Sequence, residues 1–309
     1  MNDYCASIDF GTNTARLLIA VRSSAGITPV RVEREIVRLG GGFTDRHGLS
    51  AEAWERGLNC LHRFSKIISE YGVREVRASA TSAVRDAVNG AAFVDKVLRD
   101  TGIDLVVIDG DEEARLTLKG VLSGLDSVND TIVVLDVGGG STEFTVSSQG
   151  DPVFIKSMPI GVVRLTEGFR TSIEMIGRVR SVIDQLERDL SSAGMLVSEN
   201  FELIGTAGTA TTIAAIKLEM VDYDYCKVNN FTVSRADIDA IYQRLSKLNS
   251  QERLSVKGLE KGREDLIIAG LIIITSVMDK FGFKRLKVSD FGLLEGLALE
   301  TGPTLHRKP

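Results

Sequence analysis

The sequence is poor in cysteine and histidine, and each scarcity excludes a class of chemistry. The 309 residues include three cysteines and three histidines. Cys5, Cys60 and Cys226 lie far apart and form no CxxC pair, which excludes the usual zinc-site and disulfide patterns and predicts buried thiols in a reducing compartment. No histidine lies beside a nucleophilic turn, so a Ser-His-Asp triad is excluded as well.

Excess positive charge and long apolar runs are also missing. Lys and Arg total 37 against 42 Asp and Glu, and the formal net charge of −5 excludes the basic footprint of a nucleic-acid-binding protein. The longest apolar run, Leu266–Met278, is shorter than the roughly 20 residues that span a bilayer, so it predicts a buried helix and no membrane contact. The first residues lack the basic flank of a signal peptide, and we expect a cytoplasmic protein.

Apolar strand-like runs alternate with amphipathic helical stretches along the whole chain. The expected strands are 5–10, 15–21, 29–38, 73–80, 105–108, 132–136, 143–147, 153–158, 201–204 and 285–288. The expected helices are 51–71, 91–100, 112–125, 173–193, 234–248, 263–281 and a last one from 293. This alternation predicts the α/β class.

An internal repeat predicts two similarly built domains. Residues Ile8–Arg16 align with Leu135–Glu143, so that an Asp, a Gly and a hydroxyl residue fall in register between apolar strands. We therefore expect domains at 1–128 and 129–309, facing each other across a cleft. A terminal helix near 300–309 can pack back on the first domain.

The second copy of the repeat carries the richest chemistry. The glycines Gly138–Gly140 after a strand let backbone N–H groups approach a phosphate closely, and Ser141 and Thr142 add hydroxyl donors. Asp136 can hold a divalent metal, and Glu143 can orient water or also bind the metal. A ligand-free glycine hairpin is the alternative, but the flanking polar residues and the first copy favour phosphate binding.

The first copy supplies further candidate phosphate ligands in Thr12, Asn13 and Thr14. Asp9, the counterpart of Asp136, is a third candidate metal ligand. Arg16 stands in register with Glu143 and either pairs with a carboxylate or touches a phosphate. Taken alone, this segment would be a polar hairpin turn.

Three other segments add candidates. Gly205–Thr209 lies between a strand and a helix, where an anion can bind the helix N-terminus, although it is not a Walker A motif. Glu113 opens a helix at the domain boundary and can activate water, whereas the helix dipole alone would also favour acids there. Arg85 can stabilise a transferring phosphoryl group, or it forms a surface ion pair with Asp86 or another carboxylate.

Taken in order, the motifs IDFGTNTARLLI, ATSAVRDAVN, GDEEARL, LDVGGGSTEF, GTAGTATTIAA and GREDLIIAG resemble the exopolyphosphatase/guanosine pentaphosphatase (Ppx/GppA) family over nearly the whole chain. The resemblance implies two duplicated ribonuclease-H-like domains of the actin-like ATPase superfamily, with an active-site cleft between them. It also implies that Glu113 is the catalytic Glu, that Glu143 is the second functional Glu, and that Asp136 belongs to the metal site. Arg85 matches the site arginine, and the two glycine-rich segments match the phosphate loops.

The activity implied is a metal-dependent exopolyphosphatase, which releases orthophosphate from the end of inorganic polyphosphate. Mg²⁺ or Mn²⁺ is the expected metal, with K⁺ as a stimulating ion. The alternatives are a guanosine pentaphosphate (pppGpp) 5′-phosphohydrolase, an ATPase or kinase of the same superfamily, and a polyphosphate or alarmone sensor without catalysis.

The sequence departs from the family in two ways. The first loop has Thr-Asn-Thr where Ser-Asn-Ser is usual, which keeps every hydroxyl. The chain also resembles the short, two-domain form, without the extra C-terminal domains that build a long channel and a dimer, so a homodimer stays an open expectation. Four basic residues, Arg253, Lys257, Lys261 and Arg263, either guide a polyphosphate chain or form a solvated run.

Overall fold

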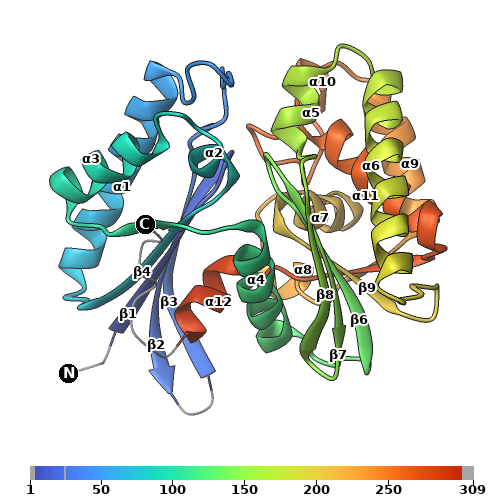
Figure 1. The fold of residues 1–309 in the computed structure, drawn as a ribbon, viewed down its shortest axis with the longest axis horizontal. Helices are drawn as coiled ribbons and strands as arrows, with labels where there is room; N and C mark the ends of the chain where they lie inside the picture. The colour runs from blue at the N-terminus through green and yellow to red at the C-terminus, as the bar shows by residue number, and fades with distance from the viewer. Residues whose placement is uncertain (1–3, 24–25, 301–309) are drawn as a thin grey trace. The chain divides into compact units, whose positions relative to one another are not determined.

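The computed structural model describes residues 4–23 and 26–300, which fold as two compact units (Figure 1). The first unit is formed by Met1–Ser123 together with Gly292–Pro309, and the second by Gly124–Phe291. Each unit contains its own sheet and its own main hydrophobic core.

This division differs from the expected one, 1–128 and 129–309, in where the C-terminal segment belongs. Helix α12 (Leu293–Leu299) is part of the first unit, because its apolar side chains pack against that unit's sheet. The packed side chains are Leu294 and Ala298 of α12 with Cys5, Leu18 and Ala20 of the sheet. Of the terminal segment that we expected to pack back, 301–309 lie outside the described residues.

The first sheet has the strand order β3-β2-β1-β4-β5. Its strands are β1 (Tyr4–Phe10), β2 (Thr14–Ser23), β3 (Gly26–Ile36), β4 (Glu75–Ala80) and β5 (Leu105–Val107). The first three are antiparallel neighbours, and β4 and β5 run parallel to β1. The central strand β1 is covered on both faces, which explains why Cys5–Ile8 are buried in succession instead of alternately.

Helices cover both faces of the first sheet (Figure 1). On one face lie α1 (Ala51–Glu70) and α3 (Gly90–Thr101), and on the other lie α4 (Gly110–Gly124) and α12. Helix α1 begins as predicted, because Ser50 Oγ accepts a 3.2 Å hydrogen bond from the Ala53 N–H. The sequence did not predict the single turn α2 (Ser82–Arg85) after β4.

The second sheet repeats the first and has the order β10-β11-β9-β6-β7-β8. Its strands are β6 (Thr131–Val137), β7 (Thr142–Ser148), β8 (Asp151–Met158), β9 (Glu202–Thr206), β10 (Thr232–Ser234) and β11 (Arg285–Val288). Strands β8-β7-β6-β9-β11 reproduce both the order and the directions of β3-β2-β1-β4-β5, with β10 added at the edge. The expected α/β class with two duplicated ribonuclease-H-like domains is therefore confirmed.

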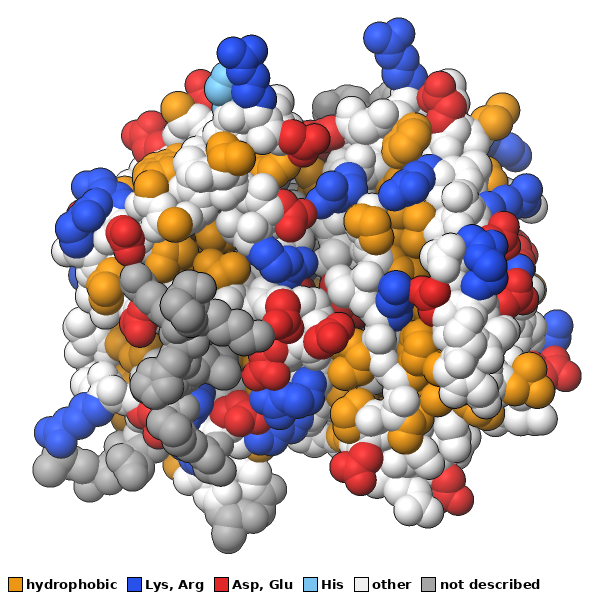
Figure 2. Space-filling view, in the orientation of Figure 1, with side chains coloured by type: hydrophobic (Ala, Val, Ile, Leu, Met, Phe, Trp, Pro, Cys, Tyr) orange, Lys and Arg blue, Asp and Glu red, His pale blue; other side chains and the backbone are white. Residues whose placement is uncertain are grey.

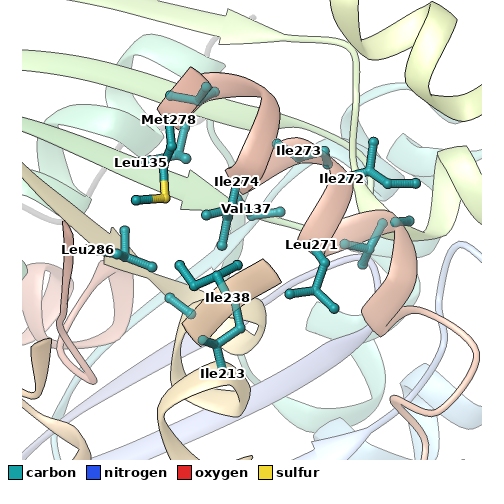
Figure 3. Close-up of a cluster of buried hydrophobic side chains, with 14 of the residues drawn as sticks. Leu135, Val137, Ile213, Ile238, Leu271, Ile272, Ile273, Ile274, Met278 and Leu286 are labelled. Carbon is teal, nitrogen blue, oxygen red and sulfur yellow. The ribbon is translucent and has the colours of Figure 1, made fainter. Parts of the chain in front are cut away.

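The helices of the second unit surround a large apolar core. They are α5 (Val162–Gly168), α6 (Ser172–Ser192), α7 (Ala207–Lys217), α8 (Tyr225–Val228), α9 (Arg235–Ser246), α10 (Ser250–Arg253) and α11 (Ile267–Phe281). The long apolar run forms α11 and is buried, as predicted; Figure 3 shows Ile274 and Met278 of α11 beside Val137 and Leu135 of β6. Among the described residues, no helix combines the length and apolarity needed to cross a bilayer.

Two expectations about local structure need correction. Cys5 and Cys60 are buried free thiols as predicted, but Cys226 is exposed, because it lies in the one-turn helix α8 at the surface. The loop expected over 205–209 is much shorter: β9 continues to Thr206 and α7 begins at Ala207, whose φ of 60° makes the sharp turn between them.

The alignment of the two repeat copies holds at the level of single residues. Asp9 is the cross-strand partner of Arg16, as Asp136 is of Glu143. In each copy a glycine N–H closes the turn with a 3.0 Å bond to the carbonyl three residues on, from Gly11 to Thr14 O and from Gly138 to Ser141 O.

Candidate functional site

In the first unit, the β1–β2 turn is held from two sides. The carbonyl of Thr12 accepts from the Gly40 N–H at 2.8 Å, and the carbonyl of Asn13 accepts from the Arg38 N–H at 2.9 Å. The Thr12 hydroxyl also lies 2.8 Å from Ser82 Oγ, at the start of α2. The predicted phosphate-binding turn is therefore fixed to the short helix that carries Arg85.

Asn13 has a polar atom that the described residues do not satisfy. Its side chain is 6% exposed, and Nδ2 donates a long bond of 3.4 Å to the Thr14 hydroxyl. The other amide atom, Oδ1, is buried and has no hydrogen-bond partner among the described residues. An unsatisfied buried amide oxygen costs about 1–3 kcal/mol, and a hydrogen-bond donor at this position would remove that cost.

The structure brings Arg85 and Glu113 together. Arg85 Nη1 donates to the Ile108 carbonyl at 2.9 Å and to Glu113 Oε2 at 3.3 Å, while its Nε lies 3.8 Å from Asp86 Oδ1. Glu113 is 8% exposed and lies in the first turn of α4. The ion-pair alternative is therefore observed for Arg85, with Asp86 and with the candidate catalytic carboxylate of Glu113.

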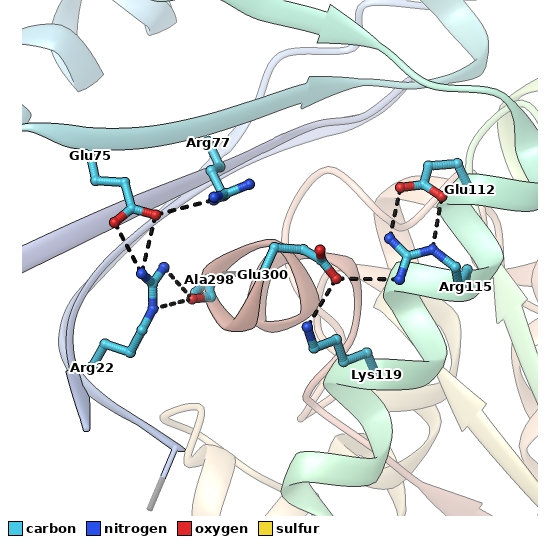
Figure 4. Close-up of polar contacts among 8 residues, drawn as sticks. All are labelled: Arg22, Glu75, Arg77, Glu112, Arg115, Lys119, Ala298 and Glu300. Atoms are coloured by element: carbon cyan, nitrogen blue, oxygen red, sulfur yellow. Dashed lines mark hydrogen bonds and ion pairs between the residues drawn. The ribbon is translucent and has the colours of Figure 1, made fainter. Parts of the chain in front are cut away.

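The neighbouring Glu112 has a different environment (Figure 4). It accepts two hydrogen bonds from Arg115, which also pairs with Glu300. The Glu112 hydrogen bond raises the pKa of Arg115. Burial opposes ionisation of Glu300, but Lys119 and Arg115 outweigh it and lower the pKa of Glu300. Of the two adjacent glutamates, only Glu113 is buried against Arg85, while Glu112 binds Arg115, the arginine that also contacts Glu300.

At the strand ends of the first unit, Asp9 and Arg16 differ from their counterparts in the second. Asp9 neighbours Ser79 of β4 and Arg16 of β2. Arg16 Nη2 lies 3.6 Å from Glu295 Oε1 on α12. The carboxylate alternative is therefore observed for Arg16.

In the second unit, the glycine turn has a defined backbone orientation. The carbonyls of Gly138 and Gly139 accept from the Val162 N–H at 3.0 Å and the Val163 N–H at 2.8 Å, and the carbonyl of Gly140 accepts from Arg164 Nε at 2.9 Å. In a planar trans peptide the carbonyl and the following N–H point in opposite directions. The N–H groups of Gly139, Gly140 and Ser141 therefore point away from α5, as in a nest that binds anions.

Thr142 does not have the role that we expected. It is fully buried, and its hydroxyl donates to the Ile160 carbonyl at 2.6 Å. The single hydroxyl proton is therefore used inside the protein and is not a donor to phosphate. Its function is to hold the turn against the segment before α5.

Asp136 and Glu143 lie on the same face of the sheet, because directly opposed residues of antiparallel strands share a face. Glu143 is 1% exposed, and its Oε1 accepts from Ser157 Oγ at 2.7 Å. One or two carboxylates, completed by phosphate oxygens and water, are a donor set that Mg²⁺ takes in phosphate-binding enzymes. The described residues contain no cluster of three or more His, Cys, Asp or Glu suited to a metal, and Asp9 belongs to the first unit.

The strand-to-helix turn at Gly205, Thr206, Ala207, Gly208 and Thr209 places an arginine at a helix N-terminus. A Cβ at Gly208 would lie 1.8 Å from Arg263 Nη1, so the guanidinium packs directly on this backbone. The helix dipole disfavours a positive charge at a helix N-terminus unless a negative charge lies beside it. Glu260 supplies such a negative charge, because its Oε2 lies 2.9 Å from Arg263 Nε. The Thr206 hydroxyl is occupied, since it donates to the Phe291 carbonyl at 3.0 Å.

The basic run near this turn is not one surface. Arg253 donates to the Leu245 and Glu264 carbonyls, and burial lowers its pKa. Arg263 is 9% exposed, whereas Lys257 and Lys261 are exposed. The expected guide for a polyphosphate chain is thus reduced to two lysines. On the face in Figure 2, acidic and basic side chains of the described residues are interspersed.

Sequence reasoning missed the residues that support the glycine turn. These residues come from a later segment of the chain than Asp136–Glu143. Ser157 lies in β8, Gly161 directly precedes α5, and Arg164 lies in the first turn of α5. No motif marked them, because their contribution is a contact between segments rather than a pattern along the chain. The only available signal was the placement of Gly161 directly before an apolar pair.

Nearly the whole chain is similar to known proteins. A model of the Ppx/GppA phosphatase family matches residues 18–305. The bifunctional 3-dehydroquinate synthase/phosphatase of Fusobacterium nucleatum is 37% identical over 96% of this chain, which spans only 46% of that protein. Exopolyphosphatase 2 of Mycobacterium tuberculosis is 33% identical, with 95% of this chain and 97% of that protein covered.

Solved structures show the same architecture. An exopolyphosphatase from Cytophaga hutchinsonii has a TM-score of 0.86 and 28% identity, covering 95% of this chain and 96% of that one. The Ppx/GppA enzyme of Aquifex aeolicus has a TM-score of 0.79 and 30% identity, covering 96% and 98%.

Proposed function

This chain belongs to the Ppx/GppA phosphatase family, and we propose that it hydrolyses the terminal phosphoanhydride bond of inorganic polyphosphate. The observation that carries this proposal is the backbone of the glycine turn. Its three carbonyls are bound on one side, so the N–H groups of Gly139, Gly140 and Ser141 are presented together on the other. Three successive N–H donors on one side of a turn suit the terminal phosphate of a polyanion.

Glu113 is assigned as the general base. Water attacks the terminal phosphorus, its proton passes to the Glu113 carboxylate, and the bond to the bridging oxygen breaks. The products are orthophosphate and a chain shorter by one phosphate. Arg85, 3.3 Å from Glu113, orients that carboxylate and stabilises charge on the phosphoryl oxygens.

The remaining candidates are assigned to binding. Asn13 Oδ1 is a buried acceptor without a partner among the described residues, and a water molecule that also donates to a phosphate oxygen would satisfy it. Arg263 brings positive charge to the N-terminus of α7, where a second phosphate of the chain would complete the pairing. Such local groups supply the positive field, so a net charge of −5 does not conflict with a polyanionic substrate.

Asp136 and Glu143 are the residues that would hold Mg²⁺ or Mn²⁺, and we propose K⁺ as a stimulating ion. When bound, a divalent cation supplies neutralisation of the phosphate charge. The choice of polyphosphate over the 5′-phosphate of guanosine pentaphosphate is supported by the likeness to a curated exopolyphosphatase over nearly its full length. Guanosine pentaphosphate is the second candidate, because its terminal phosphoanhydride offers the same chemistry. We also propose that the protein is located in the cytoplasm and forms a homodimer.

The proposal is tested by phosphate release from short polyphosphate, long polyphosphate, guanosine pentaphosphate and ATP, measured side by side. We expect the wild-type protein to release phosphate from polyphosphate. The rate of release should be at least about 100-fold lower in Glu113→Gln, because this substitution keeps the shape of the side chain and removes the base. The matched control is Glu112→Gln. The Glu112 carboxylate is bound by Arg115, so its loss should leave turnover unchanged.

Other outcomes would change the assignment. Full activity of Glu113→Gln refutes the role of Glu113. Turnover of ATP without polyphosphate cleavage indicates a kinase or ATPase. Binding of polyphosphate without turnover, with metal supplied, indicates a sensor.

A further inference from the structure

The first turn of α5 is capped by the glycine turn itself. The opening N–H groups of a helix lack intrahelical partners, and in α5 no side chain caps them. They donate to the glycine carbonyls instead: Val162 to Gly138, and Val163 with Arg164 to Gly139. The helix and the turn therefore fix each other's backbone.

The last of the three carbonyls is held differently. Gly140 O accepts not from a backbone N–H but from the guanidinium Nε of Arg164, at 2.9 Å. The peptide between Gly140 and Ser141 is thus held by a charged side chain, in addition to the bond from the Gly138 N–H to Ser141 O that closes the turn. Glycine has the widest backbone freedom, so without this bond nothing in α5 would set the direction of the Ser141 N–H.

We propose that Arg164 is a positioning residue for the hydrolytic reaction, acting through the Gly140–Ser141 peptide. It aims the Ser141 N–H at the terminal phosphate. A cation on a carbonyl also polarises the peptide and strengthens the N–H as a donor, since hydrogen bonds in a chain reinforce one another. This inference rests on the proposed function of the glycine turn as the phosphate cradle.

Packing does not account for the conformation of Arg164. Its neighbours Val162, Val163 and Leu165 are buried, whereas Arg164 is exposed. An exposed arginine gains rotamer freedom by extending into water, and holding it against a carbonyl costs about 1 kcal/mol or more of side-chain entropy. The bond to Gly140 offsets part of that cost and fixes the orientation of the peptide.

The kinetic test compares Arg164→Met, which keeps the aliphatic stem, with Arg164→Lys, which keeps a cationic donor. Removal of a whole oxyanion donor costs about 10²–10³ in kcat, so loosening one donor should lower kcat about tenfold. We expect a KM for long polyphosphate within about twofold of wild type, because the other donors still bind the chain. Arg164→Lys should recover most of the rate. Arg170→Met, an exposed arginine after α5, is the control and should be unchanged.

A second readout does not depend on turnover. In protein labelled with ¹⁵N-serine, inorganic orthophosphate should shift the Ser141 amide resonance in wild type and Arg170→Met, and shift it much less in Arg164→Met. Wild-type kcat in Arg164→Met, or an equal Ser141 shift, overturns the inference. So does equal loss of rate in Arg164→Lys with a lowered melting temperature, which would indicate a purely structural role. Failure of the proposed function is seen separately, as wild-type protein that releases no phosphate from any substrate.

Discussion

Replacing Gly161 with alanine should both destabilise the second unit and impair phosphate release. A Cβ at this position would lie 2.4 Å from Gly139 O and 2.6 Å from the carbonyl carbon of Gly140. These atoms belong to the backbone, so no flexible side chain can move aside. The start of α5 would have to withdraw from the glycine turn.

The size of the effect follows from the contacts that are lost. Overpacking a rigid site costs about 1–3 kcal/mol. Withdrawal also weakens the bonds from Val162 to Gly138 O, 3.0 Å, and from Val163 to Gly139 O, 2.8 Å. For a unit of this size, each 1 kcal/mol lowers the melting temperature by roughly 2–4 °C, so we expect a decrease of about 2–12 °C. Because the N–H groups of the glycine turn would no longer point at the bound phosphate, kcat should fall at least about tenfold.

Gly168→Ala is the matched control, because it lies at the end of the same helix and a Cβ there would meet no heavy atom within 4 Å. In a helix, alanine is favoured over glycine by up to about 1 kcal/mol, so this variant should be as stable as wild type or slightly more stable. Denaturant unfolding and phosphate release are measured for both variants. If Gly161→Ala unfolds at the wild-type midpoint with wild-type kcat, the close contact is not required and the argument fails.

Three further changes have defined outcomes. The hydrogen bond from Arg22 lowers the pKa of the Glu75 carboxyl, so the Arg22–Glu75 pair stabilises the folded protein above pH 4.5. The loss of stability caused by Glu75→Gln, measured by urea unfolding, should therefore shrink as the pH falls through the folded-state pKa of Glu75. Thr142→Val leaves the Ile160 carbonyl unsatisfied and should cost about 1–3 kcal/mol, whereas Thr142→Ser should be near neutral by the same assay. Asp136→Asn should raise the Mg²⁺ concentration needed for half-maximal phosphate release, and an unchanged requirement would exclude Asp136 as a ligand.

The sequence alone was sufficient for the features that repeat or alternate along the chain. Apolar periodicity predicted the α/β class, and the run at 266–278 predicted the buried helix α11. The match of Asp9 and Arg16 with Asp136 and Glu143 correctly aligned the two hairpins, because cross-strand register follows directly from the length of a tight turn.

Only the tertiary structure decided which groups are available for chemistry. The pattern ST in the glycine motif gave Ser141 and Thr142 equal standing, but the contact with Ile160 occupies the Thr142 hydroxyl. The adjacent glutamates of EEAR were likewise separated by their partners, Arg115 for Glu112 and Arg85 for Glu113.

The same distinction explains what the sequence did not place. No motif marked the contacts of Gly161 and Arg164 with the glycine turn. Arg263 was expected only as one of four basic residues, and its position on the start of α7 follows from the tertiary structure. The sheet to which α12 belongs is set by its apolar contacts with β1 and β2. Local sequence determines how a segment folds, because backbone and nearest-neighbour terms dominate there. Which atoms a ligand can reach depends on segments distant in the chain, since they use up some donors and leave others exposed.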